Sequence, residues 1–351
     1  MRVIERARQA AKLTLATSLQ YSGAMSLIRA RRLQNRAVIL MYHRIIPESE
    51  ARFDYAPTGM VVTTPVFDMH MRHLARTHKT VTMPELVTLL DSGEAQDRPL
   101  AAVTFDDGWL DNYTNAFPLL QRHQVPATIF IASNFIDDKE YYWLERMKLV
   151  LAHAHRVLVT ESIPLGQRDA LKKALAALNV TDLAGSLHPR LGMFLASQAR
   201  NVQSLGLTDR CSYLEKIEQI ASLAALPDTR YFMNWNEIRT LRDEGITIGA
   251  HTTTHTELTS VDASHLQDEI GIGKARLEEE LQQTVDHFAY PYGKHNKDIQ
   301  AAIAANGFSS ACTTVNGLVN RDTGRLLLNR VNMHTSVSMT RSMFAYRAMG
   351  L

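Results

Sequence analysis

Two adjacent carboxylates, Asp106 and Asp107, follow the apolar run 101–105 and precede Gly108. Carboxylates packed together at the end of a buried strand repel each other, so a bound cation would favour the arrangement by neutralising one of them. The other carboxylate could then act as a general base. The structural alternative is an Asp-Asp-Gly turn that only begins the helical pattern at 111–123.

Two histidines, His251 and His255, stand four residues apart after a second apolar run, 246–250. Histidines at this spacing on a helical turn direct their rings to one point, where they can bind a metal. With Asp107 they would form a site of two imidazoles and one carboxylate that leaves positions open for water and substrate. Water bound there becomes a usable nucleophile near neutral pH. Two surface histidines in a threonine-rich loop are the alternative.

A third run, 288–293, has the sequence Phe-Ala-Tyr-Pro-Tyr-Gly. Pro291 fixes the backbone φ angle, and the chain can turn at Gly293. The backbone N–H of Tyr292 could then face a substrate and stabilise an oxyanion. Alone, this run would indicate a buried strand that ends in a turn. Together, the three runs predict a metal-dependent hydrolase.

The elements that must position these residues are short apolar runs of strand length. There are seven of them, at 38–44, 101–105, 127–132, 246–250, 287–290, 308–313 and 326–331. Helical periodicity falls between most of them, at 65–77, 84–91, 111–123, 235–244, 261–283 and 296–306. This alternation predicts a parallel sheet covered by helices, and seven units favour a barrel over an open sheet. No G-x-G-x-x-G follows any strand, which disfavours a dinucleotide-binding fold.

Two stretches lie outside this alternation. The Leu/Ala-rich stretch at about 137–230 has only helical patterns and predicts a helical insertion after the third strand. Residues 1–36 carry eight Arg or Lys and one Glu, whereas the remainder has a net charge of −5. This segment predicts a basic amphipathic helix that lies either on the domain or on an anionic membrane. We therefore expect an N-terminal helix at 1–36 and a barrel domain at 37–351 that contains the insertion.

The composition is that of an ordinary globular protein, with 45% hydrophobic and 21% charged residues and a net charge of +2. Beyond the N-terminal segment no basic patch is interleaved with aromatic residues, so we expect no nucleic-acid partner. Cys211 and Cys312 form no C-x-x-C pair, and no run of about 20 apolar residues predicts a membrane-spanning helix. Scarce cysteines and the lack of a clear secretory signal predict a cytoplasmic protein, with its basic helix at the inner membrane face.

The three runs, in this order and each after a strand, resemble the motifs of the polysaccharide deacetylases (carbohydrate esterase family 4, the NodB homology domain). The resemblance covers about 38–135 and 231–334, including Met-Tyr-His-Arg at 41–44 and Asn-Trp-Asn-Glu-Ile at 234–238. It implies a partial (β/α)7 barrel and a divalent metal, with zinc expected. It also implies hydrolysis of N-acetyl groups on an amino-sugar glycan. The basic segment 1–36 and the lack of a clear secretory signal add the hypothesis of a lipid-linked or nucleotide-linked sugar precursor as substrate.

The resemblance also implies roles for individual residues. By position, Asp106 matches the general base, and Asp107, His251 and His255 match the metal ligands. Tyr292 matches the residue whose backbone N–H helps to form the oxyanion hole.

Several positions depart from the family pattern. The arginine that pairs with the base in many members is replaced by Phe288, and Arg330 is our candidate substitute. His334 resembles the family's general acid in spacing only, and His43 at the end of the first strand is its rival. No pair of aspartates stands before Trp235, where a further family motif would supply them.

These departures leave two alternatives open. The chain could hydrolyse another non-peptide carbon–nitrogen bond, such as that of a cyclic amide or ureide, on the same barrel. It could instead be a non-catalytic carbohydrate-binding or assembly module that keeps the metal site and has lost the acid.

Overall fold

The computed structural model describes residues 2–51, 59–136 and 230–351, residues 150–176 apart from 152 and 155, and residues 209, 212, 215, 218 and 219. The chain divides into two compact units. The first contains Met1–Arg52, Thr58–Asp137 and Tyr231–Leu351, and the second contains Phe53–Pro57 and Asp138–Arg230. Most of the predicted insertion at 137–230 lies outside the described residues, which include its helix α8 (Leu165–Ala176). The elements below belong to the first unit.

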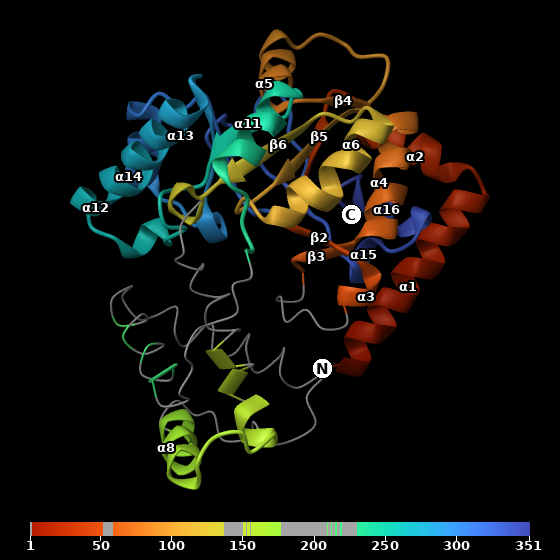
Figure 1. The fold of residues 1–351 in the computed structure, drawn as a ribbon. Helices are drawn as coiled ribbons and strands as arrows, with labels where there is room; N and C mark the ends of the chain where they lie inside the picture. The colour runs from red at the N-terminus through yellow and green to blue at the C-terminus, as the bar shows by residue number, and fades with distance from the viewer. Residues whose placement is uncertain are drawn as a thin grey trace. The chain divides into compact units, whose positions relative to one another are not determined.

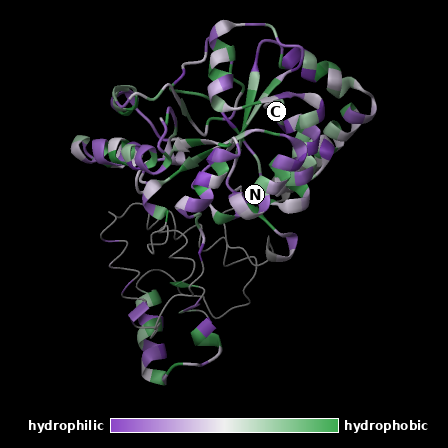
Figure 2. Ribbon diagram, turned by 45° about the horizontal axis from the view of Figure 1, so that its top comes forward, coloured by the Kyte–Doolittle hydropathy of each residue, from purple (hydrophilic) through white to green (hydrophobic). Residues whose placement is uncertain are grey.

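A parallel sheet forms the centre of this unit (Figure 1). Its strand order is β10-β1-β5-β6-β7-β8-β9, with β4 beside β5. The strands are β1 (Ala37–Tyr42), β4 (Lys79–Val81), β5 (Leu100–Phe105), β6 (Ala127–Ile131), β7 (Thr247–Ala250), β8 (His287–Ala289), β9 (Ser310–Cys312) and β10 (Val331–Asn332). Every residue of β1, β5 and β6 is buried, as expected for strands covered on both faces. The strands are correspondingly hydrophobic in Figure 2.

The segment 328–332, which ends in β10, contacts both β9 and β1. Val331 pairs with Leu40 of β1, whereas Leu328, three residues earlier, forms a parallel bridge with Cys312 of β9. The predicted partial (β/α)7 barrel is therefore confirmed. The predicted strand 326–331 is too long, because the backbone N–H of Arg330 donates to Val315 rather than to a neighbouring strand.

Helices surround the sheet close to their predicted ranges. They are α4 (Thr64–Thr77), α5 (Met83–Ser92), α6 (Phe117–His123), α11 (Trp235–Asp243), α12 (Ala263–Gln267), α13 (Gly273–Leu281) and α14 (Lys297–Ala305). Asn234 and Glu237 form the predicted capping box at the start of α11. The predicted helix 261–283 is interrupted by a π-helical turn, Asp268–Ile272, between α12 and α13. A second π-helical turn, Asn112–Ala116, precedes α6.

Several short elements were not predicted, because three or four residues carry too little periodicity. β2 (Arg44–Ile46) and β3 (Val61–Thr63) pair in a separate parallel sheet. Two helices of four residues, α3 (Glu48–Ala51) and α15 (Thr335–Ser338), follow β2 and β10, respectively.

The basic N-terminal segment forms two helices, α1 (Arg2–Tyr21) and α2 (Ala24–Arg32), separated at Gly23. Gly23 has a φ of 76°, a left-handed conformation that glycine adopts without a Cβ clash. Ala16 and Met25 pack with Ala345 of α16 (Arg341–Arg347) and with Met349 in one buried cluster. Part of this segment therefore packs on the barrel unit. Within the described residues, no helix is both long and apolar enough to cross a membrane.

Candidate active site

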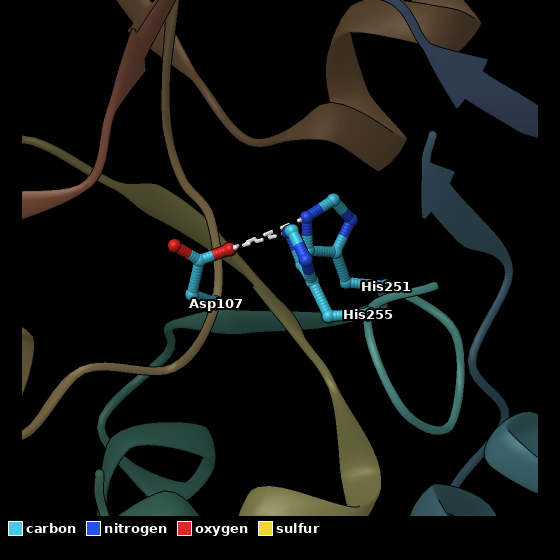
Figure 3. Close-up of side chains that lie close together, drawn as sticks. All are labelled: Asp107, His251 and His255. Atoms are coloured by element: carbon cyan, nitrogen blue, oxygen red, sulfur yellow. Dashed lines mark ion pairs between the residues drawn. The ribbon is translucent and has the colours of Figure 1, made fainter. Parts of the chain in front are cut away.

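The structure brings Asp107, His251 and His255 together at the carboxyl ends of β5 and β7 (Figure 3). The carboxylate Oδ1 of Asp107 lies 3.4 Å from Nε2 of His251 and 3.2 Å from Nε2 of His255. All three side chains are buried, and one ligand atom from each lies within 4.8 Å of the other two. Residues that follow parallel strands emerge at one edge of a sheet, which explains how positions so far apart in sequence meet.

The hydrogen bond of His251 fixes which of its nitrogens faces the site. Its Nδ1 lies 2.7 Å from the carbonyl oxygen of Ala289. A carbonyl oxygen only accepts hydrogen bonds, so Nδ1 carries a proton and Nε2 is the nitrogen that faces Asp107. Histidines that bind metals are held in their tautomer in this way.

The two oxygens of Asp107 have different surroundings. Oδ2 accepts a hydrogen bond of 2.8 Å from the indole nitrogen of Trp109. Oδ1 is buried and has no hydrogen-bond partner among the described residues, an arrangement that costs free energy unless a cation or another donor is present. One carboxylate oxygen and two imidazole nitrogens are ligands that zinc accepts. The three residues therefore fit a divalent metal.

The charges around Asp107 keep it ionised. Burial alone would raise the pKa of its carboxyl group, but His255 and His251 outweigh burial and hold that pKa well below its ordinary value. The site thus offers a carboxylate, rather than a carboxylic acid, to a cation.

The backbone of the site is left-handed at four residues other than glycine. The φ angles are 78° at Asp107, 66° at Thr252, 58° at His255 and 57° at Tyr292. Such conformations cost free energy and persist only where the surroundings hold them, typically at functional sites.

Asp106 points to a different partner from its neighbour. Its two oxygens accept hydrogen bonds of 2.7 Å each from Nη1 and Nη2 of Arg330, whose side chain is fully buried. Burial would raise the pKa of Asp106, but the guanidinium charge outweighs it and the pKa is lowered. Arg330 therefore makes the contact expected of a substitute for the arginine that Phe288 replaces. Phe288 is itself fully buried in β8.

Of the two candidate acids, His43 lies in the site. Its Nε2 is 3.9 Å from Oδ2 of Asp106, and its side chain is 17% exposed. Nδ1 of His334 instead lies 2.6 Å from the hydroxyl of Ser336, and burial lowers the pKa of His334 to about 4. No hydrogen bond or ion pair in the described part of the chain joins His334 to either aspartate.

Tyr292 lies against the metal-ligand candidates. Its ring centroid is 4.9 Å from that of His255, edge to face, and Pro291 before it is buried. Gly293 follows with a φ of 68°, and a Cβ there would lie 2.1 Å from the hydroxyl of Thr314. Only glycine fits this turn, which fixes the path of the chain at Tyr292.

Sequence comparison supports the predicted resemblance. The sequence profile of the family described as polysaccharide deacetylase matches residues 93–160 and 211–311 of this chain. Over these two segments the chain resembles the polysaccharide deacetylases, as predicted. The predicted enzyme class, a hydrolase of carbon–nitrogen bonds other than peptide bonds, agrees with this match.

One relative resembles the chain in sequence, and two solved structures share its fold. YxkH of Bacillus subtilis (strain 168), which is named as a polysaccharide deacetylase, is 22% identical over 301 residues, or 86% of this chain and 72% of YxkH. The Streptococcus pyogenes deacetylase PplD, solved in complex with acetate, has 16% sequence identity to this chain. Its structure superposes with a TM-score of 0.58, covering 90% of this chain and 99% of PplD. IcaB from Ammonifex degensii is 17% identical, with a TM-score of 0.52 over 89% and 97% of the two chains.

One residue of this site is missing from the sequence-based prediction. Trp109 is fully buried, donates to Asp107, and lies between the ring of Phe232 at 4.6 Å and the guanidinium of Arg44 at 4.7 Å. Its position two residues after Asp107 was the available signal, since a buried tryptophan usually finds an acceptor for its N–H.

Proposed function

We propose that this chain removes N-acetyl groups from an amino-sugar glycan or glycan precursor, with Asp107, His251 and His255 as ligands of a divalent metal, zinc being the expected ion. The observation that carries the proposal is that two adjacent carboxylates contact different partners. Asp107 faces two imidazole nitrogens, and Asp106 faces a guanidinium. A metal at the first group supplies a Lewis acid and lowers the pKa of bound water.

Asp106 is the proposed general base. The two hydrogen bonds from Arg330 fix its orientation and keep it ionised, so that it can accept a proton from the attacking water. The backbone N–H of Tyr292, beside Pro291, is proposed to stabilise the negative charge that develops on the carbonyl oxygen.

We assign protonation of the departing amine to His43 rather than His334. His43 lies beside Asp106 and is partly exposed, so a substrate in the site can reach its imidazole. The products are acetate and a free amino sugar.

The test is acetate release from N-acetylglucosamine oligomers by the full chain, with and without a chelator. We expect release to stop with the chelator and to return with added zinc or cobalt. Activity on cyclic amides or ureides without acetate release would favour the other carbon–nitrogen hydrolase. A bound metal with no activity on any substrate would favour the non-catalytic module.

We also propose that α1 and α2 rest on an anionic membrane, which the sequence predicts to be the cytoplasmic face. Leu15, Tyr21 and Leu27 are 48%, 88% and 75% exposed, respectively, on the segment that carries eight basic residues and one acidic residue. Exposed apolar side chains combined with basic ones suit the surface of an anionic bilayer.

Flotation with phosphatidylglycerol vesicles tests this contact. We expect the full chain to float with these vesicles but not with vesicles of phosphatidylcholine alone. The double variant Tyr21→Glu, Leu27→Glu should not float with either kind of vesicle. Leu165→Glu, at an apolar position 63% exposed on α8, is the matched control. Flotation of the double variant equal to that of the control would rule the contact out.

A further inference from the structure

Glu269 lies in the π-helical turn Asp268–Ile272 and contacts the loop that carries both histidines. Its Oε2 accepts the backbone N–H groups of Thr253 and Thr254 at 3.1 and 2.9 Å. Its Oε1 accepts the hydroxyl of Thr254 at 2.5 Å. One half-buried carboxylate thus holds three donors of the segment between His251 and His255.

The helix backbone contributes further contacts. The carbonyl oxygen of Glu269 accepts the N–H of Thr253 at 2.9 Å, and that of Asp268 accepts the hydroxyl of Thr253 at 2.9 Å. A Cβ at Gly273 would lie 3.0 Å from the Thr253 hydroxyl oxygen, so the helix and the loop approach closely there. π-Helical turns within α-helices often occur at functional sites, and this one directs a side chain and two carbonyls toward one loop.

The loop needs such support because its conformation is costly. Thr252 and His255, on either side of the two held residues, have left-handed φ angles of 66° and 58°. The ring of His251 is fixed by the carbonyl of Ala289, whereas the position of His255 depends on the path of the chain through Thr253 and Thr254. Glu269 contacts these two residues, Thr253 and Thr254.

We infer that Glu269 is a positioning residue whose carboxylate holds the histidine loop so that the Nε2 atoms of His251 and His255 face Asp107 before a metal binds. Glu269 is not a catalytic residue, since it acts only through the loop. The inference rests on the proposed function in one respect, namely that these three residues bind a metal.

Cobalt titration of the metal-free full chain, followed by visible absorption, tests the inference without requiring a substrate. We expect Glu269→Ala to weaken cobalt binding by about 10- to 100-fold, the usual effect of losing support behind a ligand. Glu269→Gln should restore part of the affinity, because its amide oxygen can accept both N–H groups while its amide nitrogen donates to the Thr254 hydroxyl.

Asp268→Asn is the matched control. It removes the neighbouring carboxylate, whose side chain is exposed, and keeps the backbone carbonyl that accepts from Thr253. We expect wild-type cobalt affinity from this variant. Amide hydrogen exchange in the metal-free chain gives a second measurement: Glu269→Ala should exchange faster over 251–256 and unchanged over β1 and β5.

Cobalt affinity of Glu269→Ala within about twofold of wild type would overturn the inference. If the alanine variant does not fold, Glu269→Gln decides: weaker binding than Asp268→Asn supports the inference, and equal binding overturns it. A wild-type chain that binds no cobalt would overturn the metal site and this inference together. Wild-type binding without acetate release would overturn the deacetylase proposal alone.

Discussion

At the scale of single residues, the site separates the tasks of two neighbouring carboxylates through their partners. Asp106 is paired with a buried guanidinium, and Asp107 lies between two imidazoles and an indole N–H. Both are buried, so partners rather than solvent determine their charge. Adjacent groups of the same kind can therefore serve one as a base and the other as a ligand.

The assignment of the acid predicts different effects for two histidines. His43→Gln should lower kcat by about 100- to 10,000-fold, the usual contribution of a general acid, because this imidazole lies beside Asp106. His334→Gln should change kcat little, because the His334 ring is directed to Ser336. Steady-state kinetics of both variants, with zinc content measured in parallel, would check this. A large loss of kcat for His334→Gln alone would reverse the assignment.

The indole of Trp109 predicts a selective effect on metal affinity. Trp109→Phe keeps an aromatic ring beside Phe232 and Arg44 but removes the indole hydrogen bond to Oδ2 of Asp107. We expect zinc affinity to fall by about 10-fold or more, as measured by competition with a chromogenic chelator. Trp235→Phe, at another buried tryptophan in α11, serves as control. Equal affinities of the two variants would show that the indole N–H does not support Asp107.

At the scale of elements, the carboxyl ends of parallel strands position the site. Asp106 and Asp107 follow β5, His251 follows β7, and Tyr292 follows β8. This edge could be predicted from sequence, because each apolar run ends at a residue capable of chemistry. The break at Gly23 and the π-helical turn before α13 could not, since both leave the helical spacing of apolar residues nearly unchanged.

A group of buried histidines around α4 predicts a pH dependence of stability. Burial lowers the pKa of His70 to about 3, of His73 to about 4 and of His78 to about 3. These side chains are neutral in the folded chain near pH 5 but largely protonated in the unfolded chain. The free energy of unfolding therefore decreases as pH falls below the ordinary value of 6.5 toward the lowered pKa values.

His73 offers the cleanest test, because neither ring nitrogen has a hydrogen-bond partner in the described part of the chain. Between pH 7 and pH 5, the free energy of unfolding of His73→Phe should fall by about 2 kcal/mol less than that of wild type. Urea unfolding at pH 7 and pH 5 would measure it, with His265→Asn at an exposed position as control. The same decrease in His73→Phe as in wild type would mean that His73 is protonated in the folded chain.

At the scale of the whole molecule, the sequence was sufficient for the barrel, the family and the meeting of Asp107 with His251 and His255. It was not sufficient for the support around them. Arg330 could be named from the sequence as a candidate partner of Asp106, but its two hydrogen bonds could not. The hydrogen bond from the Trp109 indole and the place of His43 likewise depend on side-chain directions, which residue spacing does not encode. The helical insertion at 137–230 stays a prediction where it lies outside the described residues.

The most direct test of the central claim compares Asp106→Asn with wild type for both zinc content and acetate release. Because Asp106 faces Arg330 and not the imidazole pair, the variant should keep one zinc per chain. Its rate of acetate release should fall by about 100-fold or more. His255→Ala should lose both. Near-wild-type acetate release by Asp106→Asn, with zinc bound, would contradict the assignment of the base and the mechanism built on it.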